Sequence, residues 1–218
     1  MFDIDFARYR VIDLTVLVVP GQEKRRMEIR RKTIEVDDTY MFEIDTMSHI
    51  GTHVEAPSHY VAEWKDVTEL DVMRFMGKAG VLDVDFDKLR QPITPEVFEK
   101  GLGDIIDDVE VVIMRNLARR CRPPQKADER HYLTIEGARW LVEKGMKMFG
   151  FDTSFCTGED KEAARATHEI LLGKDVVLIE VLGNLSELRR RQCYFMALPL
   201  KIKGLDSSPV RAIAIEER

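Results

Sequence analysis

The chain has 218 residues, of which 44% are hydrophobic and 33% charged, and its formal net charge at pH 7 is −6. This composition is typical of a globular protein with a substantial core, and we expect one domain over residues 1–218. The negative net charge excludes nucleic acid as the expected partner, since phosphate binding needs a basic surface.

The cysteines and the apolar runs indicate where the protein works. Cys121, Cys156 and Cys193 are odd in number and lack CxxC spacing, which favours free thiols in a reducing compartment. The first residues show no basic-then-apolar signal pattern, and no apolar run approaches the roughly 18 residues of a membrane helix. We therefore expect a cytoplasmic protein with no membrane partner.

The N-terminal part of the chain is predicted to form strands. Residues 11–19 are apolar and β-branched, as in a buried strand. Residues 23–32 carry dense charge of both signs, which fits either the solvated edge of a hairpin or the rim of a substrate opening. Residues 33–37 and 41–44 predict two short strands flanking the turn-type pair Asp37-Asp38.

The next segment holds three of the chain's five histidines and one carboxylate, namely His49, His53, Glu55 and His59. These are ligand types for Zn, Mn or Fe, and their clustering favours a metal site over ordinary polar residues of a loop. A glycine, β-branched residues and a proline argue against a helix here. In an extended chain His53 and Glu55 point the same way, but His49 would lie about 13 Å from His53. We therefore expect a bend at Gly51, the residue that bends most cheaply.

Helices and strands alternate in the middle of the chain. A short helix or loop over residues 66–76 precedes a strand over residues 79–85. Thr94 and the proline after it start a helix that ends at Gly101. Residues 109–114 are the strongest central strand, because they are almost uniformly apolar.

A basic loop follows that strand. Arg115, at the end of the strand, can hold a substrate carboxylate through two hydrogen bonds, although a solvated surface loop explains the arginines equally well. His131 lies in a charged segment and is expected at the surface. The remaining members of the loop are Arg119, Arg120, Arg122 and Pro123-Pro124.

The periodicity of the following segments predicts an α/β fold. A second helix over residues 135–148, capped by Thr134, precedes a strand over residues 149–152. A third helix covers residues 161–172, and His168 within it indicates by itself only a packed or exposed histidine. This alternation predicts a single α/β domain with mixed β-sheets, some of whose pairs are parallel, and with packed helices.

Glu180 interrupts an apolar strand over residues 176–182. A lone carboxylate in such a strand is costly unless it is paired, hydrogen-bonded or bound to metal. This favours a functional carboxylate; the alternatives are a salt bridge to an arginine or an outward-facing edge position.

The sequence resembles the cyclase-like metal-dependent hydrolases, a family that includes bacterial kynurenine formamidase and isatin hydrolase. The family motif is His-x-Gly-Thr-His-x-Asp-x-Pro-x-His, and Glu55 stands where the family has aspartate. The likeness continues in short segments of the C-terminal half and implies a swivelling β/β/α fold. The residues that match the motif are His49, Gly51, Thr52, His53, Pro57 and His59. The later segments are residues 150–153, 168–172, 179–185, 198–201 and 208–211.

The resemblance implies a metal centre. Five ligands suit two ions, or one ion of five- or six-fold coordination, with Zn2+ or Mn2+ as the metal. Glutamate at position 55 remains an oxygen donor and has one methylene more reach than aspartate. The implied ligands are His49, His53, Glu55, His168 and Glu180.

A mechanism follows from these residues. A metal lowers the pKa of its bound water toward 7 and polarises a carbonyl, so metal-bound hydroxide is expected to attack that carbonyl. The resemblance makes His59 the general acid/base, and its ordinary pKa of about 6.5 suits transfer of a proton to the departing nitrogen of an amide.

We therefore predict an arylformamidase-like hydrolase whose small-molecule substrate is a formamide or a cyclic amide. The first alternative is a metal-dependent cyclase or lyase acting on a small oxygenated acid. The second is a non-catalytic metal-binding relative in which Glu55 has spoiled the chemistry. The resemblance also implies a homo-oligomer, a dimer or a tetramer, and the three arginines of residues 188–192 fit either its interface or a solvated turn.

Overall fold

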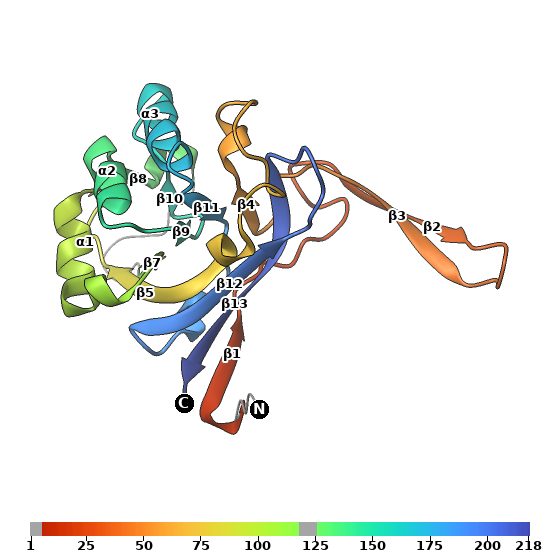
Figure 1. Ribbon diagram of the computed structural model, residues 1–218, viewed down its shortest axis with the longest axis horizontal. Helices are drawn as coiled ribbons and strands as arrows, with labels where there is room; N and C mark the ends of the chain where they lie inside the picture. Colours follow the sequence, from red (N-terminus) through yellow and green to blue (C-terminus); the bar gives the residue numbers. More distant parts are fainter. Residues whose placement is uncertain (1–5, 118–125) are drawn as a thin grey trace.

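The computed structural model describes residues 6–117 and 126–218. Its centre is an eight-stranded sheet in the order β1-β13-β12-β5-β7-β9-β11-β4, next to a three-stranded sheet β10-β8-β6 and a two-stranded sheet β2-β3 (Figure 1). The strands are β1 Tyr9–Asp13, β2 Met27–Thr33, β3 Tyr40–Thr46, β4 His53–Glu55, β5 Met76–Val84, β6 Pro92–Ile93, β7 Val111–Asn116, β8 His131–Leu133, β9 Met148–Phe151, β10 Phe155–Cys156, β11 Val177–Glu180, β12 Gln192–Pro199 and β13 Ser207–Glu217. The α-helices are α1 Pro95–Leu102, α2 Ile135–Glu143 and α3 Lys161–Leu172, and the 3-10 helices are η1 Phe6–Arg8, η2 Pro57–His59, η3 Val72–Phe75, η4 Gly103–Asp108, η5 Ala127–Glu129 and η6 Leu185–Glu187.

The large sheet closes on itself. Its strands β5, β7, β9 and β11 are parallel, whereas β4 pairs antiparallel with both β11 and β13. Apolar side chains from the two halves of this ring, among them Val54, Val81, Ile113, Phe195 and Ala212, meet in one buried cluster inside it. The strand β4 is therefore held from both sides at the point of closure.

The three α-helices cover the outer face of the parallel strands (Figure 1). A second buried cluster lies between them and the sheet, and in it the rings of Phe98 and Trp140 stack 4.9 Å apart. The prediction of an α/β fold with mixed sheets and packed helices is confirmed. β1 and β13, from opposite ends of the chain, pair in one sheet; the expectation of one domain over residues 1–218 stays a prediction.

Several element boundaries differ from the predicted ones for local reasons. The first strand ends at Asp13 instead of continuing to residue 19, because the Asp13 carboxylate accepts a hydrogen bond from the backbone N–H of Thr15 and turns the chain. The helix predicted over residues 135–148 ends at Glu143, since Gly145 has a positive φ of 70° and Met148 already belongs to β9.

The hairpin of β2 and β3 stands away from the rest of the molecule (Figure 1). We call residues 27–46 the arm. The strand predicted over residues 41–44 lies within β3, whereas the strand predicted over residues 33–37 is wrong: β2 covers residues 27–33, and residues 35–37 form the turn of the hairpin. Residues 23–32 belong mostly to the exposed arm, as the hairpin-edge interpretation expects. Their rim interpretation also has support, because Arg25 donates a hydrogen bond to the carbonyl oxygen of His49.

Two further expectations concern the cysteines and the membrane. Cys156 and Cys193 are free, whereas Cys121 lies outside the described residues. Within residues 6–117 and 126–218, no helix is long and apolar enough to cross a membrane.

Candidate metal centre

Register in the sheet places two predicted ligands side by side. His53 on β4 lies opposite Glu180 on β11, and Glu55 lies opposite Ser207 on β13. Val54, between the two β4 residues, points into the buried cluster of the closed sheet. Because neighbouring strand residues face opposite ways, His53 and Glu55 both point out of the closed sheet.

The bend predicted at Gly51 is confirmed. Gly51 has a φ of +57°, and a Cβ atom there would lie 2.4 Å from Cγ2 of Val18. Only glycine suits both the conformation and the space. The bend returns His49 to the cluster, where its Nδ1 lies 3.1 Å from Oε1 of Glu55.

Two more histidines reach the same carboxylate from other elements. Asp160 caps α3 by accepting from the N–H of Ala163, and His168 on this helix places its Nε2 3.4 Å from Oε2 of Glu55. His59 ends the short helix that starts at Pro57, and its Nε2 lies 3.7 Å from Oε1 of Glu55. The structure therefore brings all six predicted site residues together around Glu55.

In each of the four imidazoles, one ring nitrogen is held by a hydrogen bond and the other faces the carboxylates. A carbonyl oxygen only accepts, so Nδ1–H of His53 donates to the carbonyl of Gly51 at 2.7 Å and Nδ1–H of His168 donates to that of Ala164 at 2.6 Å. Their Nε2 lone pairs therefore point inward. Such outer hydrogen bonds fix the tautomer of metal-ligating histidines in proteins.

The inner atoms fit a cation. Nε2 of His53 and Oε2 of Glu55 are buried and have no hydrogen-bond partner among the described residues. The ligand atoms of His53, Glu55 and Glu180 lie within 4.8 Å of one another, as do those of His49, Glu55 and His59. Lone pairs and carboxylate oxygens that face one another without donors are costly unless a cation lies between them. The residues therefore fit a divalent metal, with Glu55 common to both groups.

The surroundings of the two carboxylates, Glu55 and Glu180, shift their pKa values in opposite directions. Burial favours the neutral form of both. At Glu55, the nearby imidazoles of His168, His49 and His53 favour the charged carboxylate more than burial opposes it, and they hold its pKa well below the usual range. At Glu180, burial and the neighbouring charge of Glu55 raise the pKa to about 7. The pKa values of His49 and His168 are raised, because hydrogen bonds to Glu55 outweigh the opposing effect of burial.

These shifts predict that metal binding weakens in acid. A proton on Glu180 competes with a cation, and the pKa of about 7 at Glu180 means that this competition extends up to about that pH. The raised pKa values of His49 and His168 act in the same direction. The dissociation constant for Zn2+ or Mn2+ should rise about tenfold per pH unit below about pH 7 for each proton released. Competition with a chromophoric chelator between about pH 5.5 and pH 8 measures this; a constant affinity across that range would contradict it.

Asp206 completes the centre, and sequence reasoning missed it. Its Oδ2 accepts from Nε2–H of His49 at 2.9 Å and from Nδ1–H of His59 at 3.0 Å, and Oδ1 accepts from Ser48. These hydrogen bonds outweigh burial and lower its pKa to about 2. The only signal in the sequence is that an aspartate precedes residues 208–211, a segment of the family resemblance.

Removing the carboxylate of Asp206 is expected to loosen two imidazoles at once. We predict that Asp206→Ala lowers metal affinity and activity by about 10- to 100-fold, the usual effect of losing a hydrogen-bond partner behind a ligand. Lys203→Ala, at an exposed position of the same loop, serves as the control. Wild-type metal affinity in a folded Asp206→Ala protein would show that the carboxylate does not position the histidines.

Two other residues singled out in the sequence lie outside the cluster. The surface position predicted for His131 is wrong: its ring is fully buried, tilted against Phe86 and Phe155, and its Nδ1 accepts from the N–H of Gln91. Burial lowers the pKa of His131. Its sequence neighbours are charged, but β8 carries its side chain inward.

Arg115 forms its hydrogen bonds within the chain. Its guanidinium makes two hydrogen bonds with the carboxylate of Asp83 and two more with the carbonyl oxygens of Leu185 and Leu188. This geometry accounts for the arginine without a substrate carboxylate. The arginines and prolines of residues 119–124 lie outside the described residues.

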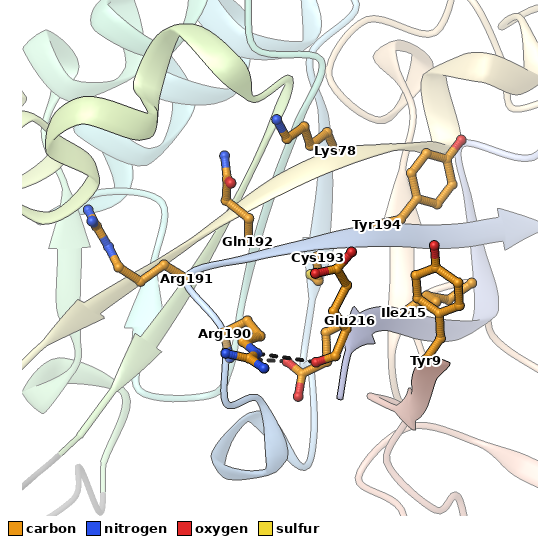
Figure 2. A pocket seen from close by; sticks show the side chains of 10 residues that line it. Tyr9, Lys78, Arg190, Arg191, Gln192, Cys193, Tyr194, Ile215 and Glu216 are labelled. Atoms are coloured by element: carbon orange, nitrogen blue, oxygen red, sulfur yellow. Dashed lines mark hydrogen bonds between the residues drawn. The ribbon is translucent and has the colours of Figure 1, made fainter. Parts of the chain in front are cut away.

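A cavity of about 600 Å³ lies elsewhere, on the face of β12 and β13 (Figure 2). None of the six predicted site residues lines it. Its arginines have partners in the chain: the backbone N–H of Arg190 donates to Glu216, and Arg191 pairs with Asp104 and the carbonyl of Leu102. The arginines of residues 188–192 are thus held within the chain, which fits the expected turn.

The fold and the cluster together define an enzyme-like divalent-metal site on a closed α/β sheet, and comparison with known proteins agrees. The family model described as "Putative cyclase" matches residues 12–156. A kynurenine formamidase from Bacillus cereus is 33% identical over 175 residues, which cover 77% of this chain and 77% of that protein.

Solved structures show the same architecture. Isatin hydrolase A from Labrenzia aggregata, bound to benzyl benzoate, matches with a TM-score of 0.76 at 25% identity and covers 97% of this chain and 95% of its own. A potential metal-dependent hydrolase with cyclase activity has the same fold, with a TM-score of 0.72 at 22% identity over 96% of this chain and 99% of its own. The chain belongs to the cyclase-like family of metal-dependent hydrolases.

Proposed function

We propose that this protein is a metal-dependent hydrolase that cleaves the C–N bond of a small non-peptide amide, either a formamide or a cyclic amide. The observation that carries the proposal is the convergence of four imidazoles and two carboxylates, each imidazole with one nitrogen facing inward. The relatives named kynurenine formamidase and isatin hydrolase support the substrate class.

In this proposal His49, His53, Glu55, His168 and Glu180 hold one or two ions of Zn2+ or Mn2+. Such an ion supplies activation of water and polarisation of the substrate carbonyl. The carbonyl oxygens of Gly51 and Ala164 and the carboxylate of Asp206 leave the inner nitrogens of His53, His168 and His49 free to bind an ion by accepting from their outer nitrogens. The rigid strand β4 and helix α3 hold these groups in place before substrate arrives.

His59 is the residue of the cluster that can act as the general acid/base. It is the most exposed imidazole of the cluster, its Nδ1–H donates to Asp206, and its Nε2 is directed at the centre. In this proposal Nε2 takes up the proton that the attacking water loses as the C–O bond forms and passes it to the departing nitrogen, and the Asp206 carboxylate stabilises the cationic imidazole between the two transfers. The C–N bond breaks as this N–H bond forms.

Product analysis separates this function from its alternatives. With an aryl formamide, the metal-loaded protein should release formate and aryl amine in equal amounts. A cyclase or lyase would lose or add water without breaking the C–N bond, and a non-catalytic relative would release nothing above a metal-only control. Either of these outcomes with a broad set of formamides and cyclic amides would overturn the proposal.

Glu55→Asp tests whether glutamate is a working ligand. Glu55 reaches His49 and His168 with opposite oxygens, and shortening the side chain by one methylene withdraws the carboxylate from one of them. We expect kcat/KM to fall about tenfold, as for other displaced groups around a metal. A large gain would instead identify a degenerate site that the family's aspartate repairs.

The choice between Zn2+ and Mn2+, the number of ions, the cytoplasmic location and the homo-oligomeric state stay predictions. Metal analysis settles the first two.

A further inference from the structure

Arg165 lies on α3, three residues before His168. Residues three apart on a helix are neighbours on its surface, with about 5–6 Å between their Cβ atoms. Arg165 is therefore one helical turn from the histidine whose Nε2 lies 3.4 Å from Oε2 of Glu55. The segment after β4, which carries His59, runs beside this part of α3 (Figure 1). Arg165 thus lies at the rim of the metal centre.

The guanidinium of Arg165 is placed over the ring of Tyr60, the residue that follows His59. Its Cζ lies 5.6 Å from the centroid of that ring. A guanidinium over an aromatic face is held by cation–π attraction, while the N–H groups in its own plane stay free. Those N–H groups match the two oxygens of a carboxylate.

Tyr60 is itself fixed against α3. Its hydroxyl donates to Oε2 of Glu169 at 3.1 Å, and its ring lies 5.7 Å from the ring of Trp64. Trp64 packs in turn on the end of the helix, where a Cβ atom at Gly173 would lie 3.0 Å from Cη2 of the indole. These contacts hold the segment that carries His59 against the helix that carries Arg165, so the position of the guanidinium is set before substrate arrives.

The charge of Arg165 has no anion of its own. Its side chain is exposed, and among the residues that the structure describes it forms neither an ion pair nor a hydrogen bond. The acid one turn later, Glu169, accepts from Tyr60. Two other arginines considered for a substrate role, Arg115 and Arg25, bind groups of the chain itself. Arg165 is therefore a cation at the rim with its donors available.

We propose that Arg165 binds a carboxylate on the substrate, so that the preferred substrates are aryl formamides or cyclic amides with an acidic group. This inference rests on the amide hydrolysis proposed above and adds a specificity-determining residue to it. A carboxylate held at Arg165 orients the amide at the other end of the substrate toward His59. Because the guanidinium is a helical turn away from the proposed ligands, it acts mainly on substrate binding.

Rates on matched substrates test the preference for an acid. Formanilide is neutral, and the ortho, meta and para isomers of formamidobenzoate add a carboxylate at increasing distance from the same amide. We expect kcat/KM of the metal-loaded protein for the best isomer to exceed that for formanilide at least about tenfold, mainly through KM, as for a charge-assisted two-point contact. Hydrolysis of formanilide at least as fast as that of every isomer would overturn the proposal.

A matched pair of variants tests the residue. Arg165→Gln removes the charge, and Arg139→Gln removes the same charge from an exposed position on α2. We expect Arg165→Gln to bring the ratio of kcat/KM for acid over formanilide close to one, and Arg139→Gln to keep the wild-type ratio. Arg165→Lys, which keeps the charge without the planar fork, should restore part of the preference. A preference that survives Arg165→Gln would overturn the role of this residue.

Binding measurements separate this inference from the reaction. Calorimetric titration of the metal-loaded protein with aminobenzoate and with aniline measures recognition of the carboxylate even if no amide is cleaved. We expect aminobenzoate to bind at least about tenfold more tightly than aniline, and Arg165→Gln to remove that difference. Absence of hydrolysis together with this binding pattern would overturn the proposed reaction alone. Equal affinities in the wild type, or a difference that Arg165→Gln leaves in place, would overturn the role of Arg165.

Discussion

Replacing His53 by alanine is expected to remove the metal and to lower amide hydrolysis by about 1,000-fold, since the activation of water by a bound ion is worth several kcal/mol. His53 lies in the buried middle of the cluster, 3.8 Å from Glu55 and 3.8 Å from Glu180. Its loss leaves the two carboxylates facing each other with one imidazole fewer between them. Elemental analysis of the purified variant gives metal equivalents per chain.

The control for this substitution is His59→Ala. His59 belongs to the same cluster but is not a metal ligand in our account, so this variant should keep its metal. A His53→Ala protein that retained its metal and its rate would show that the inward-facing nitrogen of His53 binds no ion. Loss of folding is a separate outcome, and thermal unfolding identifies it.

His59→Ala is expected to keep the metal and to lower kcat by about 100- to 10,000-fold, the usual contribution of a general acid or base. We expect this because His59 is exposed enough to contact a leaving group and Asp206 holds its outer nitrogen, whereas the other histidines bind the metal in our account. Titration with metal and steady-state kinetics on the same preparation measure both effects.

Two results would contradict this role. A His59→Ala protein with its metal and its full rate would remove His59 from the chemistry. Loss of metal from that protein would make His59 a ligand, which its position beside His49 and Glu55 permits.

Much of the fold follows from local sequence. Helix α3 covers the predicted residues 161–172, and the apolar strands β5 and β7 lie within one to three residues of their predicted positions. Both features depend on periodicity and caps, which neighbouring residues determine. The closure of the sheet was not predictable in this way, because it depends on β4 pairing with β13, a strand more than 150 residues away.

The site residues also differ in whether local sequence or long-range pairing determines their positions. His49, His53, Glu55 and His59 could be predicted from their clustering, and Glu180 from its misfit in an apolar strand. His168 needed the family resemblance, since nothing around it in α3 indicates a ligand. Asp206 and the burial of His131 depend on which strands meet in space, and their sequence neighbours carry no sign of it.

The most direct test of the central claim is the rate of aryl formamide hydrolysis by one preparation in three states: as purified, after removal of metal by a chelator, and after Zn2+ or Mn2+ is added back. We predict that hydrolysis is lost with the metal and returns with it, while His53→Ala stays inactive throughout. A rate that chelation leaves unchanged, or no hydrolysis in any state, would contradict the assignment of this cluster as the metal centre of an amide hydrolase.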